Sequence, residues 1–455
     1  MSTQNSSMAG LVQKYNVAAP RYTSYPTVPF WDENTFSTAA WTDQVYHTFT
    51  QSKDKGLSLY IHLPFCESLC TYCGCNTRIT KNHQVELPYI MSLLKEWEMY
   101  LAVFKERPLL SEIHLGGGTP TFFQPENLKL LIEGILKHVD VTLDSSFSFE
   151  AHPANTKTAH LQILFDLGFR RLSLGIQDFD PLVQFMINRH QTFEEVEEVM
   201  QNARTIGFDS INFDLIYGLP KQTETSVQDT IEKSMLLGPD RISFYSYAHV
   251  PWLKPGQRHY TEADLPKGTV KLALYNLGKT MILAQGYADI GMDHFAKKED
   301  ALYVAFQQER LHRNFMGYAD HYSPLLIGIG VSSISDAWGG FAQNVKTVEE
   351  YHKRIESGIL PVVKGHILNQ EDLIIRRYIL DMMCKGKVQL DPETHLTGQI
   401  KEELSTLVMD GLVTIEGDMI RCTVTGRSFL RNICMAFDQR LLKLRSKPQL
   451  FSEAI

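Results

Sequence analysis

The chain has 455 residues, of which 44% are hydrophobic and 21% are charged, and its formal net charge is −8. These values are typical of a globular protein with a large core, and the length predicts one large domain with an appendage. The acidic balance, with a pI near 6.1, argues against a nucleic-acid footprint, and no apolar run approaches the ~18–20 residues that span a bilayer.

Residues 1–35 are predicted to form an extended N-terminal arm. They are polar at first and then rich in proline and aromatic residues, and residues 19–26 read A-P-R-Y-T-S-Y-P. Pro20 and Pro26 disfavour a helix here, so a strap on the surface is the simplest interpretation. The first ten residues lack the basic-then-apolar layout of a secretory signal. We therefore expect a cytoplasmic protein whose thiols stay reduced.

An alternating apolar run at residues 57–63 predicts a strand, which Pro64 ends. Four of the seven cysteines follow within ten residues, in the order C-E-S-L-C-T-Y-C-G-C from Cys66 to Cys75. The cysteines therefore lie in a loop at the carboxyl end of a strand, where α/β folds place their chemistry.

Three kinds of site compete for these thiols. A disulfide framework does not fit a chain without secretory features, and zinc usually takes two separated ligand pairs, whereas this cluster is compact. The third is an iron–sulfur cluster, whose irons prefer thiolate ligands. Cys66, Cys70 and Cys73 would supply three ligands and leave one iron of a cubane cluster open. Cys75 as a fourth ligand would instead make an electron carrier, which would be unusual at this length.

A strand–loop–helix pattern repeats as far as about residue 245. Helical periodicity is present at residues 87–104, 125–139 and 192–206. The predicted strands are residues 57–63, 111–115, 146–150, 171–175, 210–216 and 241–245. Six such units in sequence imply an α/β fold with a parallel sheet and right-handed crossovers. Periodicity alone is compatible with part of a barrel or with an open doubly wound sheet.

Small and polar residues follow several of these strands. Residues 116–119, G-G-G-T, are a place where backbone can approach a ligand closely and where exposed N–H groups can meet a carboxylate. Glu150, Gln177 and Asp214 lie at or near the ends of three further strands. Each could simply cap a loop or form an ion pair, but their shared position favours a common cavity.

The pattern changes beyond about residue 366. Short apolar runs in residues 287–365 are expected to cover the open side of the sheet, and residues 366–455 predict a small C-terminal α+β domain. Its predicted elements are helices at 371–384 and 398–409, a hairpin at 412–423 and a helix from Gly426. This order is winged-helix-like, and the acidic balance favours a packing role over DNA binding.

The cysteine loop resembles the C-x-x-x-C-x-aromatic-C signature of the radical S-adenosylmethionine (SAM) enzymes, with Tyr72 as the aromatic residue. The spacing extended to Cys75 resembles one branch of them, the oxygen-independent coproporphyrinogen III dehydrogenases of haem synthesis. Residues 312–318, H-R-N-F-M-G-Y, are similar to the H-R-N-F-x-G-Y signature of that branch, and P-R-Y-T-S-Y-P resembles its N-terminal arm. The chain departs from the pattern at Met316, where some members have glutamine, so a side-chain hydrogen bond to a second SAM molecule stays open.

The resemblance implies a three-quarter, six-stranded (β/α) barrel over residues 36–365. It implies a [4Fe–4S] cluster on Cys66, Cys70 and Cys73, with one or two SAM molecules as cofactor. The implied SAM contacts are Tyr60, Tyr72, Gly117, Gly118, Thr119, Glu150, Gln177, Arg189, Asp214, Ala248 and Ile334. The residues expected to serve the reaction are Tyr60, Cys75, His312 and Arg313. Arg21 and Arg313 are expected to bind carboxylates of the substrate.

The activity that the resemblance implies is the conversion of coproporphyrinogen III to protoporphyrinogen IX. A 5′-deoxyadenosyl radical from SAM would remove a hydrogen from a propionate, and loss of CO₂ and one electron would leave a vinyl group, twice per substrate. An external electron donor and acceptor are implied, and we expect a monomer without membrane or nucleic-acid partners. A haem chaperone, a haem-modifying radical SAM relative and a zinc-stabilised structural protein are the alternatives. Cys75 and residues 312–318 favour the enzyme.

Overall fold

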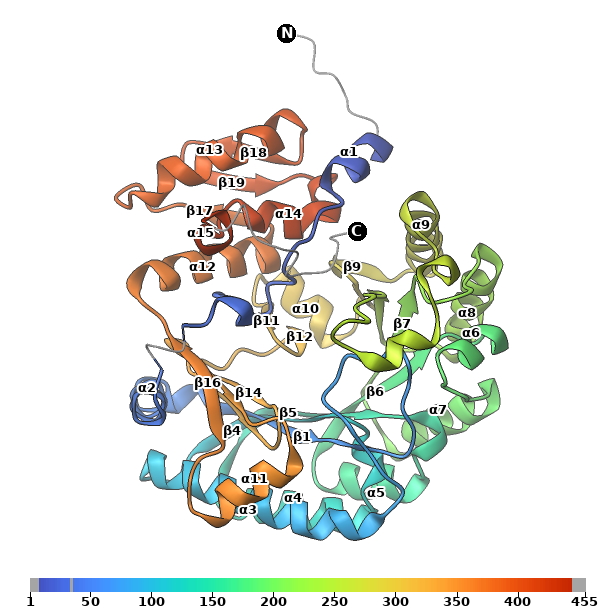
Figure 1. Ribbon diagram of the computed structural model, residues 1–455, viewed down its shortest axis with the longest axis vertical. Helices are drawn as coiled ribbons and strands as arrows, with labels where there is room; N and C mark the ends of the chain where they lie inside the picture. The colour runs from blue at the N-terminus through green and yellow to red at the C-terminus, as the bar shows by residue number, and fades with distance from the viewer. Residues whose placement is uncertain (1–7, 33–35, 444–455) are drawn as a thin grey trace.

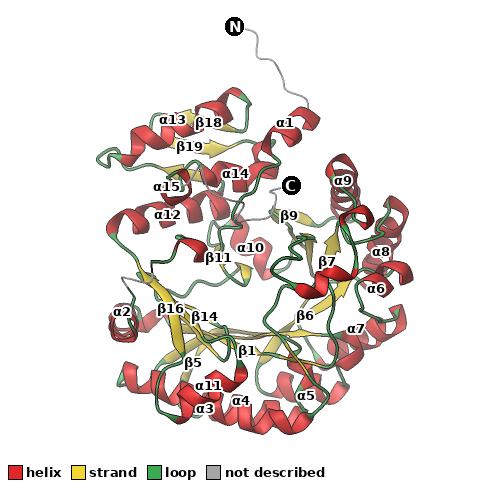
Figure 2. Ribbon diagram, in the orientation of Figure 1, coloured by secondary structure: helices red, strands yellow, loops and turns green. Residues whose placement is uncertain are grey.

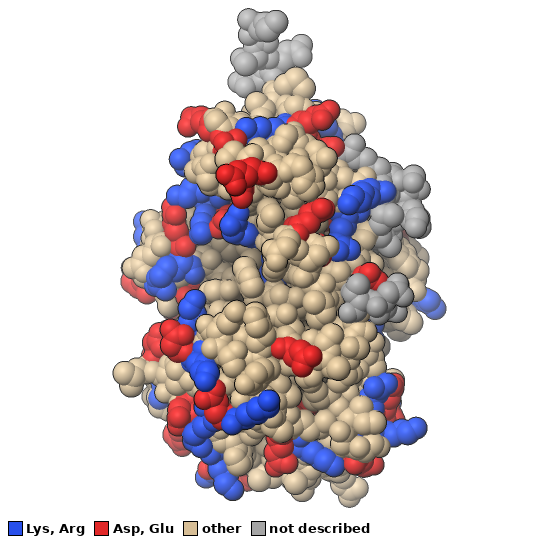
Figure 3. Space-filling model, turned by 90° about the vertical axis from the view of Figure 1, so that its left-hand side faces the viewer, with Lys and Arg blue, Asp and Glu red and all other residues tan. Residues whose placement is uncertain are grey.

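The computed structural model describes residues 8–32 and 36–443 (Figure 1). A large sheet with helices on its outer side occupies the lower part of Figure 1 and Figure 2, and a smaller, mainly helical part lies above it. Acidic and basic side chains are interspersed on the face shown in Figure 3. In the described part of the chain, no helix combines the length and apolar character needed to cross a membrane.

Six parallel strands form the centre of the sheet and confirm the predicted strand–helix repeat. They lie side by side in chain order as β1 (Leu57–Leu63), β4 (Leu109–Gly117), β5 (Asp140–Ala151), β6 (Phe169–Gln177), β7 (Ser210–Tyr217) and β8 (Arg241–Ser246). Each neighbouring pair is parallel. Every residue of β1 is buried, as expected for a strand covered on both faces.

The sheet continues beyond both ends of this parallel centre. The added strands are β10 (His294–Ala296) and β9 (Ala288–Gly291) beside β8, and β13 (Leu326–Ile329), β14 (Ile334–Asp336), β15 (Gly340–Asn344) and β16 (Val362–Ile367) beyond β1. Within the described residues, the resulting mixed sheet has twelve strands. The short apolar runs of residues 287–365 therefore extend the sheet at its two edges, because they pair with β8 and β1 through backbone hydrogen bonds.

Helices cover the outer face of the sheet. They include α2 (Thr38–Gln51), α3 (Glu86–Phe104), α4 (Pro125–Leu136), α5 (Thr158–Asp166), α7 (Phe193–Ile206), α8 (Glu224–Leu237), α9 (Gly268–Ala284) and α11 (Val348–Glu356). Thr192 begins α7 by accepting from the backbone N–H of Glu195, whose carboxylate accepts from the backbone N–H of Thr192. The apolar faces of these helices pack on the outward side chains of the strands and form the main core.

The inner face of the same strands carries the polar side chains. Because side chains alternate along a strand, Phe149 and Phe213 join the main core, while their neighbours Glu150 and Asp214 line a cavity on the other face. This alternation places polar groups of successive strands around one space at the carboxyl edge of the sheet.

The C-terminal part has a second core of its own. Its elements are α12 (Gln370–Lys385), β17 (Lys387–Gln389), α13 (Leu396–Met409), β18 (Val413–Glu416), β19 (Met419–Cys422), α14 (Leu430–Met435) and α15 (Gln439–Leu442). The three strands form a separate antiparallel sheet in the order β17-β19-β18. Gly417, at φ 60°, allows the tight turn between β18 and β19. The helix expected from Gly426 begins as a 3₁₀ turn and becomes α-helical only at Leu430.

The N-terminal segment packs against this C-terminal part. Its first described element is a helix, α1 (Met8–Tyr15), where the sequence predicted an extended arm. The helix can form because the prolines that disfavour a helix come only from Pro20 onward. Leu11 of α1 is buried in the second core. Further along, the Tyr22 hydroxyl donates to Asp438 at 3.1 Å, so the first described residues are fixed by some of the last.

Candidate active site

The cysteine loop leaves the carboxyl end of β1 and is closed at its base by two short strands. β2 (Phe65–Cys66) pairs with β3 (Arg78–Ile79), and the N–H of Thr80 donates to the carbonyl of Cys66 at 2.9 Å. All four cysteines of the loop have free thiols; Cys66, Cys70 and Cys73 are half-buried, whereas Cys75 is exposed. The three thiols predicted as ligands thus share an environment that the fourth does not.

Donors contact each of the three half-buried sulfurs. The Thr119 hydroxyl donates to Sγ of Cys66 at 3.4 Å, Nη1 of Arg189 donates to Sγ of Cys70 at 3.7 Å, and the N–H of Cys75 donates to Sγ of Cys73 at 3.4 Å. The side-chain hydrogen bond with the Cys75 thiol, more than the bond from the Cys75 N–H, lowers the pKa of Cys73 to about 7, whereas burial raises the pKa of Cys66 to about 11. Donors aimed at sulfur favour thiolates, the form in which cysteine binds iron.

The loop forms one wall of a cavity at the carboxyl edge of the sheet, with about 1090 Å³ of empty space that is partly open to solvent. The predicted residues that line it are Cys66, Cys70, Tyr72, Cys73, Cys75, Gly117, Gly118, Thr119, Glu150, Gln177, Arg189 and Asp214. The fold therefore brings twelve residues singled out from the sequence to a single space.

The glycines at the end of β4 allow close packing. A Cβ on Gly117, at φ 108°, would lie 2.5 Å from the His62 ring, and one on Gly118 would lie 2.6 Å from the Pro64 carbonyl carbon. The N–H groups of this turn are used internally: that of Gly117 donates to Glu150 at 3.1 Å, and that of Thr119 to the carbonyl of Phe65 at 3.0 Å. The Gly117 N–H thus already meets a carboxylate of the protein itself, and a contact of this turn with a carboxylate of a ligand stays a prediction.

Two carboxylates in the cavity have opposite pKa shifts. Burial acts to raise the pKa of Glu150, but the His114 ring and the Gly117 N–H offset it, so the net shift is downward. Burial and the nearby charge of Glu150 raise the pKa of Asp214 to about 6, despite hydrogen bonds from Ser173 and Asn212. Near neutral pH the cavity thus holds one firmly ionised carboxylate and one that titrates close to the physiological range.

A second cavity lies on the inner side of the sheet and shares Glu150, Ser173, Asp214 and Tyr245 with the first. The hairpin of β11 (His312–Asn314) and β12 (Gly317–Ala319) contributes Met316 and Tyr318 to its lining. The ring of Phe315, at the tip of this hairpin, meets Tyr60 edge-on with ring centroids 5.1 Å apart. The hairpin singled out from the sequence therefore adjoins the first cavity through shared walls.

Five predicted site residues do not line either cavity. Tyr60 is buried, and its hydroxyl lies 3.1 Å from Nδ1 of His62. Ala248 is linked to the first cavity through Gln257, whose side-chain amide donates to the carbonyls of Ala248 and of the lining residue Tyr72. Ile334 lies on β14 and packs beside Trp31. His312 packs against the ring of Tyr322, and the guanidinium of Arg313 lies over the ring of Tyr318.

Two histidines of the site were missed from the sequence. The His62 ring fills the space beside Gly117, and its Nε2 lies 2.9 Å from the Asn76 carbonyl. His114 lies 3.6 Å from Glu150 and 2.8 Å from the Ser148 hydroxyl. Strict alternation in β1 and β4 places both on the same face as Tyr60, which is the signal that would have found them.

Comparison with known proteins defines the class first. Residues 60–233 match the family model of the Radical SAM superfamily, and this stretch contains the cysteine loop and most of the cavity wall. The chain thus has a radical SAM domain that includes residues 60–233.

Full-length relatives then give the family. The chain is 37% identical over 459 residues to the oxygen-independent coproporphyrinogen III oxidase of Pseudomonas aeruginosa, with 98% of each protein covered. It is 38% identical over 438 residues to that of Helicobacter pylori, covering 94% of this chain and 95% of the relative. The solved coproporphyrinogen III oxidase of Escherichia coli matches with a TM-score of 0.88 at 36% identity, covering 92% and 97%. The chain belongs to the family of oxygen-independent coproporphyrinogen III oxidases.

The residues of the site fit the cofactors of a radical SAM enzyme, a [4Fe–4S] cluster and SAM. In the described part of the chain, no group of three or more His, Cys, Asp or Glu side chains is arranged to bind a single metal ion. A cubane cluster does not require that arrangement, because each thiolate binds a different iron of the cluster. Nε of Arg189 is buried without a hydrogen-bond partner. A buried guanidinium with an unused donor suits the carboxylate of an amino acid.

Proposed function

We propose that this protein converts coproporphyrinogen III to protoporphyrinogen IX without oxygen, by oxidative decarboxylation of two propionates to vinyl groups. The observation that carries the proposal is that three half-buried thiols line one cavity together with Thr119 and Arg189, which donate hydrogen bonds to two of them. The chain also matches a protein with this activity in its name over 98% of its length. Hydrogen abstraction by a SAM-derived radical is the chemistry proposed for it.

Cys66, Cys70 and Cys73 would hold the cluster, and Arg189 would bind the carboxylate of SAM through its planar fork. When bound, the cluster and SAM supply a one-electron cleavage that yields a carbon-centred radical. Thr119 and Arg189 donate hydrogen bonds to the sulfurs of Cys66 and Cys70, which would favour the thiolate form that binds iron. Glu150 and Asp214 are acceptors for hydroxyl and cationic groups of SAM. We propose the remaining contacts predicted from the sequence, Tyr60, Tyr72, Gly117, Gly118, Gln177, Ala248 and Ile334, as the surroundings of the same cofactor.

Cys75 and the 312–318 hairpin are proposed to act on the substrate side. Cys75 is exposed beside the cavity, so it is free to serve a role other than binding iron. Arg313 lies against the N-terminal arm, whereas His312 faces Tyr322 and the C-terminal part. We therefore propose an indirect, positioning role for His312.

The chain is proposed to have three parts: an arm at 1–35, a three-quarter barrel of six strand–helix units at 36–365, and a winged-helix-like domain at 366–455 with a packing role. β16 ends at Ile367 and α12 begins at Gln370, so the proposed boundary at 365/366 falls inside β16 and a cut at 368–369 would leave the large sheet whole. We further propose a cytoplasmic monomer that exchanges electrons with an external donor and acceptor and binds neither membrane nor nucleic acid.

Anaerobic reconstitution tests the proposal directly. The protein should bind about four irons per chain and, with coproporphyrinogen III, SAM, a reductant and an electron acceptor, should release CO₂ and form protoporphyrinogen IX. The Cys70→Ser variant should lose both iron and product. A haem chaperone would bind haem and SAM but form no vinyl product, and a zinc protein would contain zinc without iron; either result would contradict the proposal.

A further inference from the structure

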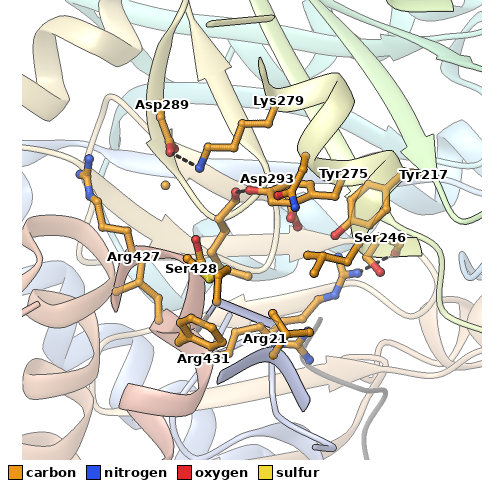
Figure 4. A pocket seen from close by; sticks show the side chains of 18 residues that line it. Arg21, Tyr217, Ser246, Tyr275, Lys279, Asp289, Asp293, Arg427, Ser428 and Arg431 are labelled. Carbon is orange, nitrogen blue, oxygen red and sulfur yellow. Dashed lines mark hydrogen bonds and ion pairs between the residues drawn. The ribbon is translucent and has the colours of Figure 1, made fainter. Parts of the chain in front are cut away.

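A third cavity lies where the N-terminal arm, the edge of the large sheet and the C-terminal part meet (Figure 4), with about 880 Å³ of empty space that includes open solvent. Arg21 enters it from the arm, Arg431 from α14, and Tyr217 and Asp293 from the large sheet and the β9–β10 turn. It is separate from the two cavities of the cofactor site, which none of these four residues lines.

The cavity lining is positively charged in a protein whose formal net charge is −8. Four basic residues, Arg21, Lys279, Arg427 and Arg431, line it with two acidic ones, Asp289 and Asp293. Lys279 forms an ion pair with Asp289 at 2.7 Å and is thereby compensated. Near the arm, Asp293 is the acidic residue that faces the arginines, and burial raises its pKa while Arg21, Arg431 and Arg313 act to lower it.

Arg21, Arg313 and Arg431 form what we call the arginine cluster. Arg431 is 7% exposed and Arg313 is 5% exposed. Nη2 of Arg313 donates to the backbone carbonyl of Arg21 at 3.3 Å, while its Nε and Nη1 are buried without partners. Burial, and then the charge of Arg21, lower the pKa of Arg431 to about 10. Buried guanidinium groups that repel one another are costly unless an anion joins them.

The arginine cluster adjoins the cofactor site through one strand end. Nη2 of Arg21 donates to the carbonyl of Ser246 at 3.1 Å, and Ser246 is the last residue of β8. Its neighbour Tyr245 lines both inner cavities. A substrate that spreads over the rim of the sheet can therefore reach the arginine cluster and the cofactor site at once.

We propose that the arginine cluster binds propionate carboxylates of the porphyrinogen that are not being decarboxylated. This inference rests on the proposed function, because it requires a substrate with several carboxylates. A guanidinium pairs with a carboxylate through two parallel N–H···O bonds, and the rings of Tyr217 and Tyr275 offer apolar surface for the methylene groups. In the absence of substrate, the carboxylate of Asp293 partly neutralises the positive charge of the arginine cluster.

Steady-state kinetics with anaerobically reconstituted protein test this assignment. Arg21→Gln should raise the KM for coproporphyrinogen III roughly 10- to 100-fold, and Arg21→Lys should raise it less, because it keeps the charge but not the fork. The dissociation constant for SAM should stay unchanged in both variants. The control is Arg107→Gln, which removes an exposed arginine paired with Asp140 at the start of β5 and should leave the KM unchanged.

Asp293→Asn gives a prediction of opposite sign. Removing the internal anion while keeping the side chain's shape should lower the KM several-fold, which loss of a purely structural contact would not do. If Arg21→Gln does not fold, as judged by its thermal midpoint, this variant alone decides the question. Wild-type protein without product would refute the proposed function, whereas an active wild type with KM unchanged in all foldable arginine and Asp293 variants would overturn only the arginine cluster.

Discussion

Nη1 of Arg189 donates to Sγ of Cys70 at 3.7 Å, and the same guanidinium also donates to the backbone carbonyl of Gly175. One side chain thus joins the cysteine loop to the carboxyl end of β6. Arg189→Lys would keep the charge but lose the planar fork, so we expect SAM to bind roughly 10- to 100-fold more weakly. Equilibrium dialysis against SAM measures this, and iron content should stay near wild type. Unchanged affinity would remove Arg189 from the cofactor site.

Cys75→Ser separates a three-thiolate cluster from a four-thiolate cluster. Because Cys75 is exposed while the other three thiols are half-buried, we expect the variant to keep about four irons per chain and to bind SAM. Cys70→Ser, assayed alongside, should lose iron. Loss of iron in Cys75→Ser as well would mean that all four thiols bind the cluster and that no iron is open to SAM.

Affinity for SAM should depend on pH through Asp214. Its pKa is raised to about 6, so the group is an anion above that pH and neutral below it. SAM carries a permanent positive charge on sulfur, so binding should weaken as the pH falls from 7 to 5, by up to about tenfold per unit below the pKa. Glu150, whose pKa is lowered, stays ionised throughout. The Asp214→Asn variant should bind more weakly and show little change over this range.

The six parallel strands could be predicted because their apolar runs and the loops that end them are local signals. β1 at Leu57–Leu63 was predicted to the residue. The edges of the sheet could not be predicted in the same way. β14 and β10 have three residues each, too few for a periodicity, and they are strands only because a longer strand supplies their hydrogen-bond partners.

The candidate site was predicted where residue type and position coincide, as for Cys66 or Glu150 at a strand end. Position in the chain did not reveal the direction of a side chain in the short hairpin. His312 and Arg313 are adjacent, yet one faces Tyr322 and the other Tyr318, because successive residues of a strand point to opposite sides. Nor did the sequence pair Arg431 with the arm, since 411 positions separate it from Pro20.

Glu96 is expected to be important for stability. This fully buried residue of α3 accepts hydrogen bonds from the Gly330 N–H at 2.8 Å, the Asn344 amide at 2.7 Å and the Tyr351 hydroxyl at 2.5 Å. Glu96→Ala would leave the buried Gly330 N–H and Tyr351 hydroxyl without an acceptor, at a cost of about 2 kcal/mol or more, whereas the Asn344 amide keeps the Gly330 carbonyl and the Ser333 hydroxyl. Urea denaturation of the apo protein should show this loss, and Glu96→Gln, which keeps one acceptor oxygen, should lose less. A midpoint for Glu96→Ala equal to that of wild type would contradict this account.

Arg431 also donates to the backbone carbonyls of Ala19 and Pro20. During synthesis on the ribosome, Pro20 therefore emerges 411 positions ahead of the arginine that anchors it. The arm can take its final place, and the cavity that Arg21 and Arg431 line can form, only after α14 has been made.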